Sequence, residues 1–434
     1  MNFLHRVLSA RCGAMSRRRI FIAGGSTTAF LGKGNPNFIW KKHAAFGKRT
    51  NPTLREMISS TVRDVLEQSG VAGSMVDRTY VSNFAGELYN QQGHLGAAVA
   101  DADSGLMYKP SMRVEGACAS GGLASLAAID ALRAGDDLCC VVGVEQQTTA
   151  SAREGGLFLA RASDFPRQSG IDDFTFPCIL AKRAKAYAQK FPHFHIDDLC
   201  PIVEKAYANG NKNPKAHMHA VKVDAQAARA SETNPHFLSN PEYKDYLRLT
   251  DCSQVSDGAS ALLLASEDGL AKAGIPMSAC VEIIGAEYGC GNLYEDPADL
   301  SRMDCATAVV NRLYARTGLQ VDDVHVAEVH DCFSIAELLM YEAIGLADHG
   351  KGADVCKEGL THIDGKLAVN TGGGLMAFGH PVGATGVKQV HEVYRQMKGQ
   401  CEAYQMSKVP EIGLTVNMGG DDKTIVSMAL RNCS

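Results

Sequence analysis

The chain has 434 residues, which at about 150 residues per domain predicts two or three structural units. Its 45% hydrophobic and 21% charged residues are typical of a globular protein and exclude a disordered or fibrous one. The net charge of −5 argues against a nucleic-acid partner, and no stretch reaches the roughly 18 uninterrupted apolar residues of a membrane-spanning helix.

The N-terminal segment differs from the rest of the chain. Residues 1–55 carry eleven Lys or Arg and no acidic residue. The first acidic residue of the chain is Glu56. The opening stretch, 1–17, is Arg-rich and able to form a short amphipathic helix, as mitochondrial transit peptides are; a disordered basic tail is the alternative. We predict that 1–17 is a targeting segment and that import into mitochondria removes roughly the first 15–20 residues.

Residues 18–150 alternate strand-like and helix-like segments, the pattern of a mostly parallel α/β sheet. One amphipathic helix begins at Thr53 and is stopped by Gly70, and an Ala/Leu-rich helix follows the glycine-rich loop around Cys118. Short apolar runs predict buried strands. The expected strands are 19–25, 112–115 and 138–144, and the expected helices are 53–69 and the segment from the loop 116–122 to Gly135.

Composition changes between residues 151 and 255. Five histidines, Asn-Pro pairs and many lysines gather there, and strand-like runs are scarce. We interpret 151–255 as an inserted domain that is largely helical and looping. Strand-like sequence returns at 261–264, so we assign 256–279 to the first half of the fold.

Residues 280–434 repeat the first half in pattern but not in identity. A strand at 367–370 leads into glycine-rich loops, then a helix that ends at Gly399 and a strand at 412–416. The same order of strand, glycine-rich loop, helix and strand surrounds Cys118. We infer two related α/β halves, with the insertion in the first.

The fourteen cysteines form neither a zinc motif nor a disulfide framework. No two are spaced C-x-x-C, and His330-x-Cys332 is the only close His/Cys pair within a motif-like segment. Zinc sites need ligands paired at short spacing, and a chain of this length needs no disulfides to fold. We expect no bound metal, and most cysteines to be small core residues in a reducing compartment.

Cys118 is a candidate nucleophile. It lies between a strand and a helix in Glu115-Gly-Ala-Cys-Ala-Ser-Gly-Gly122. The N-terminus of a helix carries partial positive charge and free N–H groups, so we expect it to lower the pKa of the thiol. Small neighbours let a substrate approach the sulfur. A core cysteine at a tight turn is the alternative.

Three further segments carry candidate catalytic groups. His380 stands in Ala377-Phe-Gly-His-Pro-Val-Gly-Ala-Thr-Gly386, the place in the second half that corresponds to Cys118, where it could take a proton or polarise a carbonyl. His330 and Cys332 follow a strand-like run at 324–329, and their i, i+2 spacing aims both to one side; a satisfied histidine and a packed cysteine are the alternative. The strand that ends in Gly419-Gly420 offers N–H groups to an oxyanion, or is a plain turn.

With these motifs, the chain resembles the thiolase family from about residue 19 to its end. The Cys118 loop, the Gly379-His380-Pro381-x-Gly383-Ala384-x-Gly386 signature and the inserted segment match in order and spacing. Most thiolases have N-E-A-F where this chain has His330-Asp-Cys-Phe333, a version similar to the sterol carrier protein thiolases, here without a sterol-carrier domain. Most also have a second cysteine in a C-x-G motif, where this chain has Asn417-Met418-Gly419.

The resemblance implies a fold and an activity. The fold is α/β, with two βαβαβαββ halves forming a five-layered αβαβα subunit, dimeric, with CoA along the insertion. The activity is that of a 3-oxoacyl-CoA thiolase of fatty-acid degradation: Cys118 becomes acylated, acetyl-CoA leaves, and CoA, a co-substrate, collects the acyl group; no tightly bound cofactor is implied. The alternatives are a decarboxylating condensing enzyme of the ketoacyl synthase type, against which the G-H-P-x-G-A signature counts, and a non-catalytic acyl-CoA binder. For location, the family suggests peroxisomes as the alternative to mitochondria.

The resemblance also assigns roles within the site. We predict that His330 and His380 stabilise the enolate oxygen, and that the backbone N–H groups of Cys118 and Gly419 hold the tetrahedral oxygen of the acyl-enzyme. The amide of Asn417 cannot act as the second acid/base, and Cys332 is the other cysteine in a family-matching loop. We therefore predict that Cys332 moves the proton; the alternative is that it only packs and that His380 or water does so.

Overall fold

The computed structural model describes residues 18–434, so the predicted targeting segment 1–17 lies outside the described residues. The described strands join in the order β3-β2-β4-β5-β1-β6-β10-β9-β7-β8. The first half contributes β1 (Ile20–Thr27), β2 (Arg78–Ser82), β3 (Ser111–Val114), β4 (Leu138–Glu145) and β5 (Gly258–Ser266). The second half contributes β6 (Val281–Cys290), β7 (Val326–Glu328), β8 (Ala368–Val369), β9 (Ile412–Gly419) and β10 (Thr424–Asn432).

The two halves have the same topology. If the five strands of each half are numbered in chain order, both read 3-2-4-5-1 from the outer edge to the junction. The junction is a short antiparallel pairing of β1 with β6, at Phe21 and Ile22. This equivalence explains the repeat in the sequence.

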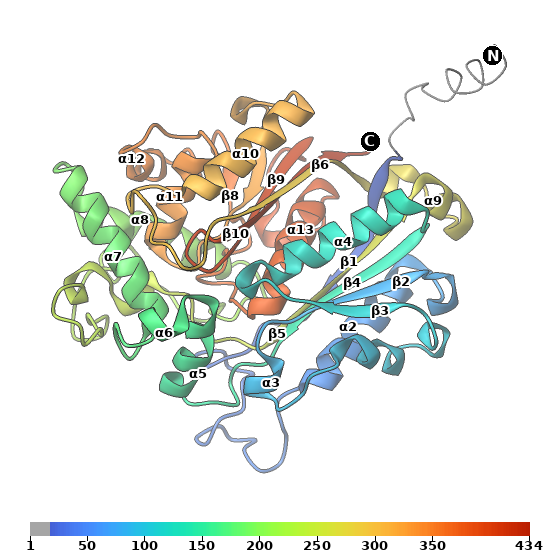
Figure 1. Cartoon of the computed structure of the whole chain (residues 1–434), viewed down its shortest axis with the longest axis horizontal. Helices are drawn as coiled ribbons and strands as arrows, with labels where there is room; N and C mark the ends of the chain where they lie inside the picture. The colour runs from blue at the N-terminus through green and yellow to red at the C-terminus, as the bar shows by residue number, and fades with distance from the viewer. Residues whose placement is uncertain (1–17) are drawn as a thin grey trace, which may run out of the picture.

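Helices complete five layers (Figure 1). The central layer holds α4 (Ser120–Ala134) and α13 (Val382–Met397), which pack on each other and on strands of both halves. One outer layer is α2 (Leu54–Ser69), against β1, β4 and β5; the other includes α10 (Asp304–Thr317), against β6 and β10, and α11 (Ser334–Ala343). The αβαβα arrangement that the thiolase resemblance implied is confirmed. The short helices α3 (Gly86–Tyr89), α9 (Glu267–Ala273) and α12 (Gly352–Lys357) lie at the periphery.

The predicted helix after Thr53 is confirmed, with the expected ends. Thr53 and Glu56 form a capping box, in which each side chain satisfies the other residue's backbone N–H. Gly70 closes the helix at φ 64°, a left-handed conformation that glycine adopts without strain. The apolar face of α2, including Met57, Ile58 and Val62, is buried against the sheet.

The first strand runs beyond Gly25, where the sequence predicts that it ends. β1 runs through Gly24 and Gly25 to Thr27, with a register shift against β5 between Ile22 and Gly24. A Cβ atom at Gly24 would collide with Ser69, and one at Gly25 with His391. The two glycines therefore serve close packing of α2 and α13 on the strand instead of ending it.

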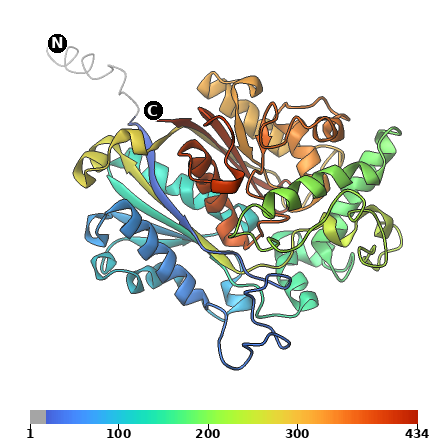
Figure 2. The same ribbon diagram turned by 180° about the vertical axis from the view of Figure 1, so that it is seen from behind.

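The insertion lies between β4 and β5. Its helices are α5 (Ala152–Leu159), α6 (Phe165–Gln168), α7 (Thr175–Lys190) and α8 (Cys200–Gly210), joined by long loops. Its buried apolar residues share a core with the second half, and Figure 2 shows the insertion lying against that half. Among residues 18–434, no helix has the length and apolarity to cross a membrane.

Candidate active site

Cys118 stands on a sharp turn between β3 and α4. Ala117 before it has φ 52°, which is unusual for a residue with a side chain and marks a strained turn of the kind found at functional sites. The Ser120 hydroxyl holds the turn, since it donates to the Ala117 carbonyl (2.6 Å) and accepts from the Gly116 N–H (3.0 Å). The turn places Cys118 at the N-terminal end of the fifteen-residue helix α4.

His380 occupies the equivalent position before α13. Its Nδ1 lies 2.6 Å from the hydroxyl oxygen of Thr385, which is fully buried. The single hydroxyl proton of Thr385 is donated to the Pro381 carbonyl (3.0 Å), so Thr385 must accept from His380 Nδ1–H. Neutral His380 therefore has an unprotonated Nε2, the form that a general base requires.

The structure brings three of the predicted catalytic side chains together. The sulfur of Cys118 and ring nitrogens of His330 and His380 all lie within 4.8 Å of one another. The two imidazole rings are 5.2 Å apart between centroids and nearly perpendicular, at 85°. The cluster therefore combines a nucleophile with a base and a second imidazole on the wall of one cavity.

The prediction of a lowered pKa for Cys118 is wrong for this structure. Burial raises the pKa of the Cys118 thiol to about 12, although the Gly420 N–H that faces the sulfur opposes this shift. Burial also lowers the pKa of His380 to about 3 and that of His330 well below its ordinary value. The thiol and both imidazoles are thus neutral at pH 7, and the proton must leave Cys118 as the sulfur attacks.

Cys332 lines the same cavity as these three residues and is 8% exposed. Its carbonyl accepts from the Ser253 N–H (2.9 Å), and the neighbouring Asp331 carboxylate accepts from the Leu375 N–H (2.7 Å). These bonds fix the loop after β7. Burial raises the pKa of the Cys332 thiol well above its ordinary value, so Cys332 carries its proton in this structure.

The two glycines at the end of β9, Gly419 and Gly420, have different positions. The N–H of Gly420 faces the sulfur of Cys118, and Gly420 lines the cavity. Gly419 instead packs against the Cys118 loop, where a Cβ atom would collide with the Gly116 carbonyl. The structure therefore adds Gly420 to the predicted site. The sequence could have indicated Gly420, because it is the neighbour of the predicted Gly419 in the Gly419-Gly420 pair.

Glu145 joins the two halves beneath the site. It ends β4, is fully buried, and accepts from the backbone N–H groups of Phe84 (2.9 Å), Ala85 (3.1 Å) and Gly383 (3.0 Å). The last of these lies in the first turn of α13, three residues after His380. Burial raises the pKa of Glu145 to about 7. No motif in the sequence pointed to this residue.

The cavity that contains the cluster is apolar and has a volume of about 270 Å³. Much of its wall comes from the insertion, and Phe333 adds a further ring from the His330 loop. Two of the rings, Phe174 and Phe237, pack edge to face at 5.5 Å. Such walls exclude water from the reacting groups. The aromatic residues that the insertion contributes are Phe174, Phe176 and Phe237.

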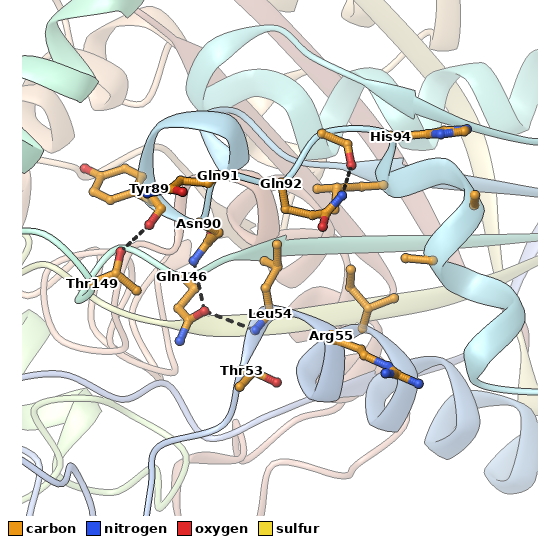
Figure 3. Close-up of a pocket in the computed structure, with 15 residues that line it drawn as sticks. Thr53, Leu54, Arg55, Tyr89, Asn90, Gln91, Gln92, His94, Gln146 and Thr149 are labelled. Carbon is orange, nitrogen blue, oxygen red and sulfur yellow. Dashed lines mark hydrogen bonds between the residues drawn. The ribbon is translucent and has the colours of Figure 1, made fainter.

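A larger cavity, of about 690 Å³, lies at the N-terminal end of α2 (Figure 3). Its wall is rich in amides: the Gln146 Oε1 accepts from the Leu54 N–H (3.1 Å) and from Asn90 Nδ2 (2.9 Å). None of the predicted catalytic residues lines it. The size of a cavity therefore does not identify the active site here; the presence of Cys118 in the smaller cavity does.

Comparisons with known proteins agree with the motifs. The family model described as "Thiolase, N-terminal domain" matches residues 41–268, and "Thiolase C-terminal domain-like" matches 292–432. An acetyl-CoA acetyltransferase of Methanothermobacter thermautotrophicus is 33% identical over 380 residues, 87% of this chain and 94% of the relative. Sterol carrier protein 2 of Homo sapiens is 28% identical over 421 residues, 95% of this chain and 72% of the relative. Among solved structures, the Ltp2-ChsH2(DUF35) aldolase has a TM-score of 0.74 at 20% identity, covering 95% of this chain and 98% of that one, a likeness of fold alone.

Proposed function

The chain belongs to the thiolase family, in its sterol carrier protein thiolase type, and we propose that it is the acyltransferase that cleaves 3-oxoacyl-CoA with CoA into acyl-CoA and acetyl-CoA. One observation carries the proposal: the Cys118 sulfur lies within 4.8 Å of two neutral imidazoles, at the start of a helix and inside an apolar cavity. CoA acts as co-substrate in this reaction.

The first half of the reaction acylates Cys118. The sulfur attacks the 3-oxo carbonyl while His380 Nε2 takes the thiol proton. The N–H groups of Cys118 and Gly420 face the sulfur, so in this proposal they hold the tetrahedral oxygen, with Gly420 in place of the predicted Gly419. The C2–C3 bond then breaks, and its electron pair forms the enolate of acetyl-CoA. His330 and the newly protonated His380 donate to the enolate oxygen, and Cys332 gives its proton to C2.

The second half returns the enzyme to its starting state. The Cys332 thiolate takes the proton of the incoming CoA thiol, and the CoA sulfur attacks the acyl group on Cys118. Cys118 leaves as a thiolate and recovers its proton from His380. The proton lost by Cys332 in the first half is thus replaced by that of CoA.

The cavity supports a substrate with an apolar acyl group. A buried cavity of about 150 Å³ accommodates a benzene ring in a model protein, and this one measures about 270 Å³. Aromatic side chains form much of its wall. We therefore include a degradative role in fatty-acid metabolism in the proposal.

The reaction is tested by mixing the protein with acetoacetyl-CoA, or with a longer 3-oxoacyl-CoA, and CoA, and following the loss of the 3-oxoacyl absorbance. Thiolysis that disappears in Cys118→Ala supports the proposal. Release of CO₂ from malonyl-CoA without thiolysis would identify a decarboxylating condensing enzyme instead. Binding of acyl-CoA with no turnover would identify a non-catalytic binder.

We also propose a homodimer. Strand β3 ends the strand order, and exposed apolar side chains lie on and beside it: Met107 and Met112 are each 46% exposed and Tyr108 is 97% exposed. Exposed apolar groups at a free strand edge favour association with a second copy. Light scattering after gel filtration should give twice the chain mass of 46.3 kDa. A lone 46.3 kDa species at micromolar concentration would contradict the dimer.

Mitochondrial import remains part of the proposal, supported by the acid-free, Arg-rich sequence 1–17. N-terminal sequencing of the protein from its native cell should show cleavage after roughly 15–20 residues. An intact Met1 in peroxisomes would contradict it.

A further inference from the structure

Asn417 lies where the two catalytic loops meet. It is on β9, is 3% exposed, and stands at the position where most thiolases have a cysteine. Its Oδ1 accepts from the Gly122 N–H (3.1 Å), and its Nδ2 donates to the Cys118 carbonyl (3.0 Å). The same Nδ2 lies 3.3 Å from Nδ1 of His330. One amide therefore contacts the nucleophile loop and a catalytic imidazole.

The partners of the amide determine its orientation. A backbone N–H can only donate, so the group facing Gly122 must be the oxygen. A carbonyl can only accept, so the group facing Cys118 must be the NH₂. This NH₂ has no lone pair to offer His330, and Nδ1 of His330 must therefore be the acceptor. A neutral imidazole with an unprotonated Nδ1 carries its proton on Nε2.

We propose that Asn417 is a positioning residue that fixes the Nε2–H tautomer of His330, so that His330 donates a hydrogen bond to the enolate oxygen. The identity of that oxygen rests on the proposed function. Thr385 holds His380 in the opposite tautomer, with Nε2 unprotonated. The two imidazoles thus enter the reaction with different roles, one as donor and one as base.

Two glycines leave room for this amide. A Cβ atom at Gly122, in the first turn of α4, or at Gly386, in the part of α13 that belongs to the His380 signature, would press on the Asn417 oxygen. Gly122 also supplies the N–H that orients the amide. The N-terminal parts of both central helices, α4 and α13, therefore leave room for Asn417, which agrees with a role in the site.

Asn417→Asp tests the proposal with little change in volume. A carboxylate has no N–H, so it accepts from His330 Nδ1–H and leaves a lone pair on Nε2 facing the substrate. Loss of one oxyanion donor lowers kcat by about 10²–10³, and we expect that loss here with a KM for 3-oxoacyl-CoA within a few-fold of wild type. Asn417→Ala, which removes the amide without adding charge, provides a second variant if the aspartate prevents folding.

Asn234→Asp is the matched control. Asn234 is 2% exposed, its Oδ1 accepts from the Thr250 N–H (3.0 Å), and its Nδ2 donates to the Ala228 carbonyl (2.8 Å). It has the same pattern of bonds as Asn417, with no histidine. We expect kcat for Asn234→Asp within a few-fold of wild type.

A spectroscopic measurement separates this role from a purely structural one. In ¹⁵N-histidine NMR spectra, with the His330 signals assigned by their loss in His330→Gln, the wild type should show protonated Nε2 and Asn417→Asp should show protonated Nδ1. Wild-type protein with the proton on His330 Nδ1, or Asn417→Asp and Asn417→Ala with wild-type kcat, would overturn the proposal. If the wild type shows no thiolysis, the proposed function fails, and the tautomer measurement still decides the role of Asn417.

Discussion

Thr385 determines which nitrogen of His380 is free to take the proton of Cys118, and Thr385→Val removes that control without changing the shape of the side chain. The hydroxyl is 2.6 Å from His380 Nδ1 and donates to the Pro381 carbonyl at 3.0 Å. In the variant, either His380 Nδ1–H is buried without a partner, or the ring takes the other tautomer and has no base facing Cys118. A buried donor without a partner costs about 1–3 kcal/mol. Because about 1.4 kcal/mol corresponds to a tenfold change in rate, kcat/KM should fall about 5- to 150-fold.

The assay is thiolysis of a 3-oxoacyl-CoA over a range of concentrations, together with mass spectrometry of Cys118 after brief exposure to acyl-CoA. Acylation should slow in parallel with turnover, because the base acts in the first step. Thr385→Ser keeps the hydroxyl and should stay within a few-fold of wild type. A folded Thr385→Val that matches wild type, or a Thr385→Ser that is as slow as Thr385→Val, would refute the reasoning.

Three further predictions concern the reacting groups. Cys332→Ala should fold, and its rate of thiolysis should fall by about 10²–10⁴-fold, the usual contribution of a general acid/base. Cys252→Ala removes another thiol from the same cavity and should keep the wild-type rate. Equal rates in the two variants would make Cys332 structural. Because burial raises the pKa of Cys118 to about 12, the rate of its alkylation by iodoacetamide should keep rising with pH up to pH 10. A rate that levels off above about pH 8.5, the ordinary pKa of a thiol, would contradict this. Since the Cys118 sulfur and two imidazole nitrogens lie within 4.8 Å, Zn²⁺ should inhibit thiolysis and protect Cys118 from alkylation until EDTA is added, and equal inhibition by Mg²⁺ would argue against binding at this cluster.

Much of the fold could be predicted because local signals agreed with the global arrangement. The ends of α2 were encoded in the Thr53 capping box and in Gly70. The end of β1 could not be predicted from its glycines, because a glycine in a strand either ends the strand or allows close packing. Only the neighbours Ser69 and His391 decide between these two roles. Those neighbours come from helices distant in the sequence.

The candidate site could be predicted as a set of residues but not as an electrostatic environment. The motifs identified Cys118, His330 and His380, which the structure brings together. The effect of burial on their pKa values depends on the cavity wall, and Phe174 and Phe237 come from an insertion with no motif to indicate them. The wrong expectation for the pKa of Cys118 arose from weighing the helix N-terminus without that wall.

The cysteine of the His330 loop and the asparagine of β9 depend on each other functionally. Most thiolases have an asparagine in the N-E-A-F loop and a cysteine in the C-x-G loop, whereas here the cysteine is Cys332 beside His330 and the asparagine is Asn417. Because Asn417 also orients His330, moving the thiol back alone should not restore activity: Cys332→Ala with Asn417→Cys loses the donor tautomer even as it regains a thiol. Adding His330→Asn replaces the imidazole by an amide, which donates a hydrogen bond without needing a fixed tautomer. The rate of thiolysis of this triple variant should exceed that of the double variant by about tenfold, the contribution of roughly one hydrogen bond. A double variant as fast as the triple one would show that His330 acts without help from Asn417.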